Sequence, residues 1–380
     1  MAMSNINNNM NFSIEGIPSN AVSIVGSVAD EECALASLLE AQAELLCKAI
    51  NPCITVCDFT TIVQSIIRTL KTIVQKNNIL ENKLRETLNF IKKEGIGCLD
   101  YNEQFELLSN LNSVLESIGA EESSLGYLID ELGKGVANIE SYCSFDDIKQ
   151  VNNLVTTLMN LIVEKNMILL RKLRTVISLI EFIKGSEFDI FIKVKKEMLY
   201  SIKKLINSIF KEEKGLAKLI FGESIKLSCA IKMCLNDEEL SELDNLITSV
   251  INVICDKKRI LEYKFSETLD LLNTVGFSSC EIDSIMDHIK ELQTRAYKGE
   301  LELSNLIKDN SKELNKFIDK ECSNYNELIR FNFCITCSLV SLLLNLNIGS
   351  KNKNAFACDS GGCNNKSICK KFNSIINMIK

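Results

Sequence analysis

The sequence has very few of the residues that interrupt helices. Only Pro18 and Pro52 are prolines, and no tryptophan occurs among the 380 residues. Leu, Ile, Lys, Glu and Asn dominate instead, so long stretches can stay helical without a break. The sequence therefore predicts an all-α protein, and its 46% hydrophobic content is enough for a substantial core.

The sequence also lacks the usual elements of an active site. Its single histidine, His288, would have to carry any Ser-His-Asp or Cys-His chemistry alone, and we expect it to be a solvated or core residue. Neither a GxxxxGK[ST] loop nor a GxGxxG loop after a strand is present. We therefore expect a non-enzymatic protein without catalytic residues and without a cofactor.

Charge and hydropathy argue against two kinds of partner. The net charge of -7 comes from 50 acidic and 43 basic residues that are mixed along the chain, so we expect no nucleic-acid partner. The longest apolar stretch, residues 334–348, is short and contains several polar residues. It predicts a buried helix rather than a membrane span.

An internal repeat is the strongest positive signal. Four segments share the frame Glu-x2-Leu-x2-Leu followed by Leu or Ile, with spacings of 90, 91 and 87 residues. The frames begin at Glu32, Glu122, Glu213 and Glu300. Leucines three and four residues apart lie on one face of a helix. We interpret the glutamates as descendants of one duplicated unit that serve as helix-surface charges or packing contacts.

A second repeated pattern, Ile-Leu-x2-Lys followed by Leu or Phe, begins at Ile79, Ile168 and Ile260. Each repeat thus contains a first and a second helix. Turn residues separate them, and Asp or Ser in these turns can cap the helix that follows. Gly95, Gly185 and Gly276 mark stops between repeats. The expected helices span residues 20–50, 58–94, 101–140, 145–184, 188–234, 237–275, 280–319 and 321–347.

Short connections predict four long antiparallel hairpins, and hence about eight long helices. The simplest packing is two tandem up-down bundles, whereas a continuous array of hairpins is the alternative. The expected parts are a flexible segment at 1–19, a first bundle at 20–185, a second at 186–348 and a cysteine-bearing tail at 349–380. The fourth repeat departs from the pattern and is expected to cap the array.

Sixteen cysteines are far more than a chain of this size usually has. The opening residues, MAMSNINNNMNFSIEG, have no basic and apolar segments of an export signal, so we expect synthesis in a reducing cytoplasm and later contact with oxidant. Most cysteines fall at the expected turns or in the tail. The candidates for disulfides within or between chains are Cys47, Cys53, Cys57, Cys98, Cys143, Cys229, Cys234, Cys280, Cys322, Cys358, Cys363 and Cys369.

The remaining cysteines, Cys33, Cys255, Cys334 and Cys337, fall within expected helices and are interpreted as small core residues. Disulfide connectivity cannot be derived from sequence. A zinc site is a weaker alternative, because no complete pair of CxxC motifs has the customary spacing. A carboxylate metal centre built on the frame glutamates would also need Glu-x-x-His motifs, and none occurs. We therefore assign no metal ligands.

The chain resembles the cysteine-rich exosporium proteins of clostridial spores. The resemblance rests on an Asn-, Lys- and Ile-rich chain of this size with sixteen cysteines, no export signal and the tail segment AFACDSGGC. It implies synthesis in the mother cell, location on the spore surface, and self-assembly into an ordered two-dimensional layer that disulfides stabilise. The expected partners are copies of the chain itself and other spore-surface proteins. A helical metal-binding or storage protein and a virion-type structural protein are the alternatives.

Overall fold

A computed structural model of the chain describes residues 17–50, 54–139, 144–184, 188–231, 233, 235–278 and 280–292. These residues belong to one compact unit. The six long helices of the described residues are α1 (Ile17–Ile50), α2 (Val56–Glu94), α3 (Tyr101–Ala137), α4 (Phe145–Lys184), α5 (Phe188–Ile231) and α6 (Asp237–Val275). A short 3₁₀ helix, η2 (Ile96–Cys98), precedes α3, and residues 280–292 are again helical. The all-α prediction is confirmed.

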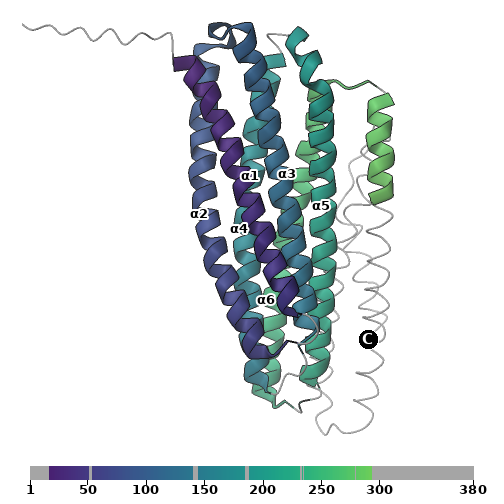
Figure 1. The fold of residues 1–380 in the computed structure, drawn as a ribbon. Helices are drawn as coiled ribbons and strands as arrows, with labels where there is room; N and C mark the ends of the chain where they lie inside the picture. The colour runs from purple at the N-terminus through teal and green to yellow at the C-terminus, as the bar shows by residue number, and fades with distance from the viewer. Residues whose placement is uncertain are drawn as a thin grey trace, which may run out of the picture. The chain divides into compact units, whose positions relative to one another are not determined.

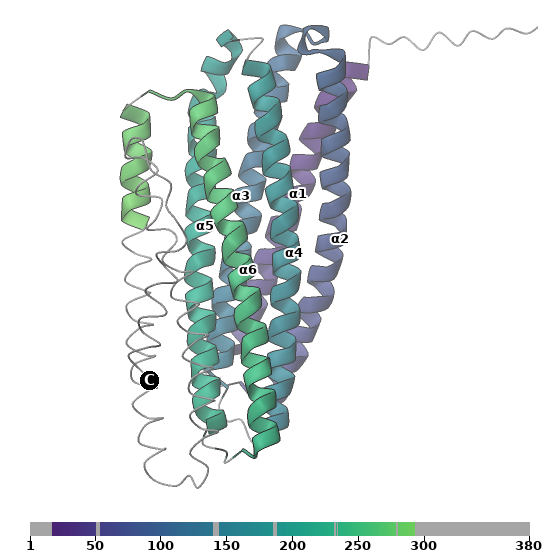
Figure 2. The same ribbon diagram turned by 180° about the vertical axis from the view of Figure 1, so that it is seen from behind.

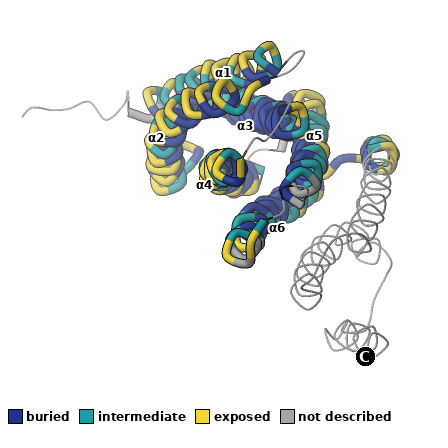
Figure 3. Tube along the Cα trace, turned by 90° about the horizontal axis from the view of Figure 1, so that it is seen from below, coloured by how far each residue is buried: buried dark blue, intermediate teal, exposed yellow. Residues whose placement is uncertain are grey.

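The helices form two rows, which Figures 1 and 2 show from opposite sides. The first helices of the three hairpins, α1, α3 and α5, pack side by side in one row, and the second helices, α2, α4 and α6, pack in the other. Each hairpin joins the two rows. In the end-on view of Figure 3 the exposed residues lie mainly on the outer sides of the helices, and the buried residues lie on the sides that face other helices. The core between the rows is thus made mostly of Leu, Ile and Val side chains.

The contact between α3 and α5 is the most extensive helix contact of the described residues. This contact joins the second and third repeats, and we expected a boundary between two bundles at Gly185, which lies between these repeats in the sequence. The described helices therefore follow the alternative of a continuous array of hairpins. The segments 1–16 and 293–380 lie outside the described residues, and so do most of the fourth repeat and the tail.

Small residues explain why α3 and α5 approach so closely. A Cβ on Gly133 would lie 2.5 Å from the backbone nitrogen of Leu219, and a Cβ on Gly222 would lie 2.5 Å from the carbonyl oxygen of Gly133. Any side chain larger than hydrogen at these positions would force the helices apart. The glycines therefore fix the distance between the second and third repeats.

The helix ends agree closely with the sequence pattern because capping residues mark them. Asp100 and Asn236 each form a capping box at the start of α3 and α6, and Thr55 accepts a hydrogen bond from the backbone of Asp58 at the start of α2. Gly276 ends α6 with a φ of 71°, a conformation that favours glycine. No described helix is long and apolar enough to cross a membrane.

Candidate functional site

Two sets of six polar residues are buried between the rows, one at each junction between neighbouring repeats. We call them the first and second junction clusters. Each takes side chains from four helices of two consecutive hairpins. The first consists of Glu32, Asn77, Ser117, Glu121, Lys165 and Lys172, and the second of Glu122, Asn166, Ser208, Glu212, Lys257 and Lys264.

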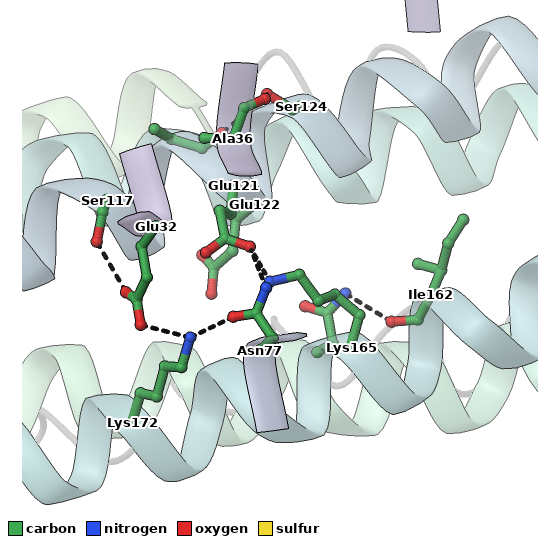
Figure 4. Close-up of polar contacts among 12 residues, drawn as sticks. Glu32, Ala36, Asn77, Ser117, Glu121, Glu122, Ser124, Ile162, Lys165 and Lys172 are labelled. Carbon is green, nitrogen blue, oxygen red and sulfur yellow. Dashed lines mark hydrogen bonds and ion pairs between the residues drawn. The ribbon is translucent and has the colours of Figure 1, made fainter. Parts of the chain in front are cut away.

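In the first junction cluster, Glu32 of α1 reaches across to the second repeat (Figure 4). Lys172 Nζ of α4 lies 2.5 Å from Glu32 Oε1, and the Ser117 hydroxyl of α3 donates to Glu32 Oε2 at 2.9 Å. Lys172 also donates to the side-chain oxygen of Asn77 on α2. The Asn77 amide in turn donates to Glu121 Oε2 at 3.2 Å.

Lys165 of α4 completes this cluster by pairing with Glu121 of α3. The side chains of both residues are fully buried. Asn77 therefore links the two ion pairs of the cluster, because it accepts from Lys172 and donates to Glu121. The result is one connected polar network that ties α1, α2, α3 and α4 together.

The second junction cluster repeats this arrangement one repeat further along. Lys264 Nζ of α6 lies 2.5 Å from Glu122 Oε1 of α3, and Ser208 of α5 donates to Glu122 Oε2 at 2.8 Å. Lys264 also donates to Asn166 of α4. The Asn166 amide donates to Glu212 Oε2 at 3.3 Å, and Glu212 pairs with Lys257. Equivalent residues thus make equivalent contacts at both junctions.

Each junction cluster contains two glutamates and two lysines, so its formal charges cancel. Burial lowers the pKa of Lys172, while the carboxylate of Glu32 acts in the opposite direction. Burial lowers the pKa of Lys165 more strongly, and the nearby charge of Lys172 lowers it further. A buried charge is tolerated only when it is paired, so each lysine requires its glutamate.

The clusters are suited to holding repeats together rather than to catalysis. Their lysine side chains are sealed from solvent at the centre of the double row. A reactive lysine must reach a substrate, and these four reach only glutamate and asparagine side chains. Charge matching between neighbours favours contact between these helix faces, because any other pairing would leave buried charges without partners.

An open groove of about 530 Å³ runs along the outer side of α1, α3 and α5. Cys33, Tyr127 and three lysines are among the residues that line it. Partial burial of the Cys33 thiol in the groove raises its pKa. A hydrogen bond with Cys47, followed by burial, raises the pKa of Tyr127 to about 12.

Five of the twelve candidate disulfide cysteines lie in the described residues, and all five lie near the ends of the double row. Cys47, Cys57 and Cys229 lie at the end of the array where first helices turn into second helices, and Cys98 and Cys280 lie at the opposite end. These five are free thiols. Disulfide bonding by the candidates stays a prediction. The other seven lie outside the described residues: Cys53, Cys143, Cys234, Cys322, Cys358, Cys363 and Cys369.

Three interpretations of single residues can be compared with the structure. The frame glutamates were expected to be helix-surface charges or packing contacts, and the fully buried Glu32 and Glu122 fit the second alternative and not the first. Cys33 is exposed, so its interpretation as a core residue is wrong too. His288 is partly buried and hydrogen-bonded to Asn207 at 2.8 Å.

Recurring polar residues could have revealed the clusters in the sequence. Ser-x3-Glu-Glu occurs in three first helices, beginning at Ser27, Ser117 and Ser208. The second helices carry lysines seven residues apart, at 76 and 83, 165 and 172, and 257 and 264. Charges that recur at fixed positions on facing helices indicate pairing across a repeat junction. No group of three or more potential metal ligands occurs among the described residues.

Two comparisons with known proteins give no information about the function of this chain. No match to the chain was found among curated proteins. A solved structure described as "Computational Design of Self-Assembling Cyclic Protein Homooligomers" is similar at 10% identity over 73% of this chain and 98% of that chain. Its TM-score is 0.17, so this likeness supports no conclusion about fold or assembly.

The family model of the alpha-helical endospore appendage domain matches the chain three times, at residues 19–91, 108–180 and 198–272. The matches coincide with the three hairpins α1–α2, α3–α4 and α5–α6. They confirm three of the four expected repeats, and the fourth stays a prediction. Together they cover more than half of the sequence. The chain belongs to the family of alpha-helical endospore appendage domains.

Proposed function

We propose that this chain is a non-enzymatic structural subunit of the spore surface that assembles with copies of itself. One observation carries the proposal: three endospore appendage domains pack in a single array through equivalent, charge-neutral junction clusters. An array of this type is quasi-one-dimensional, since each repeat contacts mainly its neighbours. A unit that already stacks on copies of its own fold is well suited to building larger assemblies.

The family supports a place on the spore surface, and so does the resemblance to spore proteins. The family description names an endospore appendage. The exosporium, a clostridial source and a flat two-dimensional layer come from the resemblance alone and stay predictions. We favour an appendage as the form of the assembly. A metal-binding or storage protein and a virion-type structural protein remain the competing functions.

Disulfide bonds between chains are expected to stabilise the proposed assembly. Cys57 lies at one end of the double row, and Cys98 and Cys280 lie at the other, all three exposed. Exposed thiols at both ends can form bonds between neighbouring molecules without unfolding a repeat. Such bonds would lock an assembly after the producing cell lyses and oxidant reaches it.

Electron microscopy of the purified full-length chain tests this function. We expect ordered filaments or sheets, and we expect a ladder of covalent multimers on gels run without reductant. Reductant should remove the ladder but leave the ordered assemblies, because the helix contacts build them and the disulfides only lock them. A monodisperse monomer with and without reductant would overturn the proposal.

A further inference from the structure

The outer side of the first repeat exposes residues whose counterparts are buried at the two junctions. We call Ser27, Glu31, Leu38, Lys76 and Lys83 the leading face. Leu38 is a leucine of the repeat frame, and its counterparts Leu128 and Leu219 are completely buried. Leu38 itself is 41% exposed. The leading face therefore has the composition of a junction, but no other repeat within the described residues packs on it.

The polar residues of the leading face form half of a junction cluster. Glu31 pairs with Lys76, and Lys83 Nζ lies 3.7 Å from Glu31 and 3.2 Å from the Ser27 hydroxyl. Their side chains are 36% (Glu31), 43% (Lys76) and 39% (Lys83) exposed. The side chains of their counterparts are buried at both junctions.

The charge of this half-cluster shows what is missing. Each complete cluster receives one glutamate and one asparagine from the preceding repeat: Glu32 and Asn77 at the first junction, Glu122 and Asn166 at the second. The leading face has two lysines but only one glutamate. One more carboxylate, supplied by a preceding repeat, would make it neutral like the others.

The backbone of α1 is also accessible for close packing. Ala34 and Ala41 are exposed on α1. The counterpart of Ala34 is Ser124 of α3, which is buried and donates to the carbonyl oxygen of Ala36 at 3.2 Å. Small side chains at these positions let a neighbouring helix approach α1 as α3 approaches α1 within the chain. End repeats usually carry a polar outer face, and this one carries leucine and alanine.

We propose that the leading face binds the last repeat of a second copy of this chain, which supplies the missing glutamate and reproduces a junction cluster between two molecules. The inference rests on the proposed function and names its interface, and it replaces the expectation that the fourth repeat caps the array. The contact joins two different surfaces of the chain. Such a head-to-tail contact does not close on itself unless the rotation forms a ring, so it extends into a filament.

The test compares two variants of the full-length chain. Leu38→Asp places a charge in the proposed contact, whereas Met167→Asp places one on α4, where Met167 is also 41% exposed. Both positions are exposed, so both variants should keep the wild-type circular dichroism spectrum. We expect the wild type and Met167→Asp to form assemblies in sedimentation and electron microscopy, and Leu38→Asp to remain monomeric.

Mixing gives a readout that a folding defect cannot imitate. The other end of a Leu38→Asp chain is unchanged, so it can still dock on a wild-type leading face and then stop growth. Substoichiometric Leu38→Asp should therefore shorten wild-type assemblies, and Met167→Asp should not. If the wild type assembles and Leu38→Asp assembles equally well, the interface is wrong but the function stands. If the wild type itself never assembles, the proposed function fails.

Discussion

Replacing Lys172 with methionine perturbs the first junction cluster at its centre. The lysine side chain is fully buried, and its ammonium lies 2.5 Å from Glu32 Oε1. Without it, the Ser117 hydroxyl at 2.9 Å is the polar partner left to Glu32 within the described part of the chain, and the cluster gains an unbalanced negative charge. Removing one partner of a buried ion pair costs roughly 3–5 kcal/mol of folding free energy.

Arg174→Met is the matched control for Lys172→Met. Arg174 lies two residues further along α4 and pairs with Glu267 of α6 at 2.6 Å, but its side chain is half exposed. An exposed pair contributes about 0.2–1 kcal/mol. Both variants remove one cation of a pair that joins α4 to another helix, so the difference between them measures the effect of burial.

Urea unfolding followed by far-ultraviolet circular dichroism is the assay, because urea is uncharged and does not screen ion pairs. The midpoint of Lys172→Met should fall much further than that of Arg174→Met. The double variant Glu32→Met/Lys172→Met should regain part of the loss, since it leaves neither charge unpaired. Equal midpoints for the two single variants would refute the structural role of the cluster.

Two further predictions concern the close helix contact and the thiols. Gly133→Ala should lower the free energy of unfolding by about 1–3 kcal/mol, because its Cβ would lie 2.5 Å from the backbone of α5. The control Gly97→Ala should change the midpoint of urea unfolding little, because no atom lies within 4 Å of its Cβ. An undiminished midpoint for Gly133→Ala would contradict the close packing. Replacing the exposed Cys57 and Cys98 with serine should shorten the ladder of multimers on non-reducing gels. The control Cys255→Ser in α6 should leave the ladder unchanged. A full ladder from Cys57→Ser/Cys98→Ser would show that these thiols do not join chains.

The sequence predicted the helices well because local residues determine where helices start and stop. Ser144 and Asp147 cap each other at the start of α4, within the turn where Asp or Ser was expected to cap a helix. The expected helices at 145–184 and 237–275 match α4 and α6 at both ends. These features act within a few residues, so they can be read from one chain.

The arrangement of the hairpins could not be derived in the same way. Short turns specify that α3 and α4 are antiparallel neighbours, but they do not specify that α3 also packs on α5. That contact depends on glycines such as Gly133 and Gly222 meeting across two helices far apart in sequence. Two bundles and one array satisfy the same turns, and only the tertiary contact distinguishes them.

The candidate site was missed for a related reason. A glutamate in a repeat frame has the composition of a helix surface, and nothing near Glu32 in the sequence indicates burial. Its partner Lys172 lies in the next repeat, so the pair becomes visible only when equivalent residues of different repeats are compared. The exposed Cys33 shows the opposite case, in which a residue type that is usually buried lies at the surface.

In the proposed assembly, the type of junction that holds repeats together within a chain also joins one chain to the next. Zero-length carbodiimide cross-linking of assemblies mixed from ¹⁴N- and ¹⁵N-labelled chains tests it, because this reagent joins only lysines and carboxylates in direct contact. We expect cross-linked peptides of mixed isotope content that join Lys76 or Lys83 to a glutamate of the last repeat of another chain. Cross-links from Lys76 and Lys83 to Glu31 of the same chain alone, in assemblies that are intact, would contradict it.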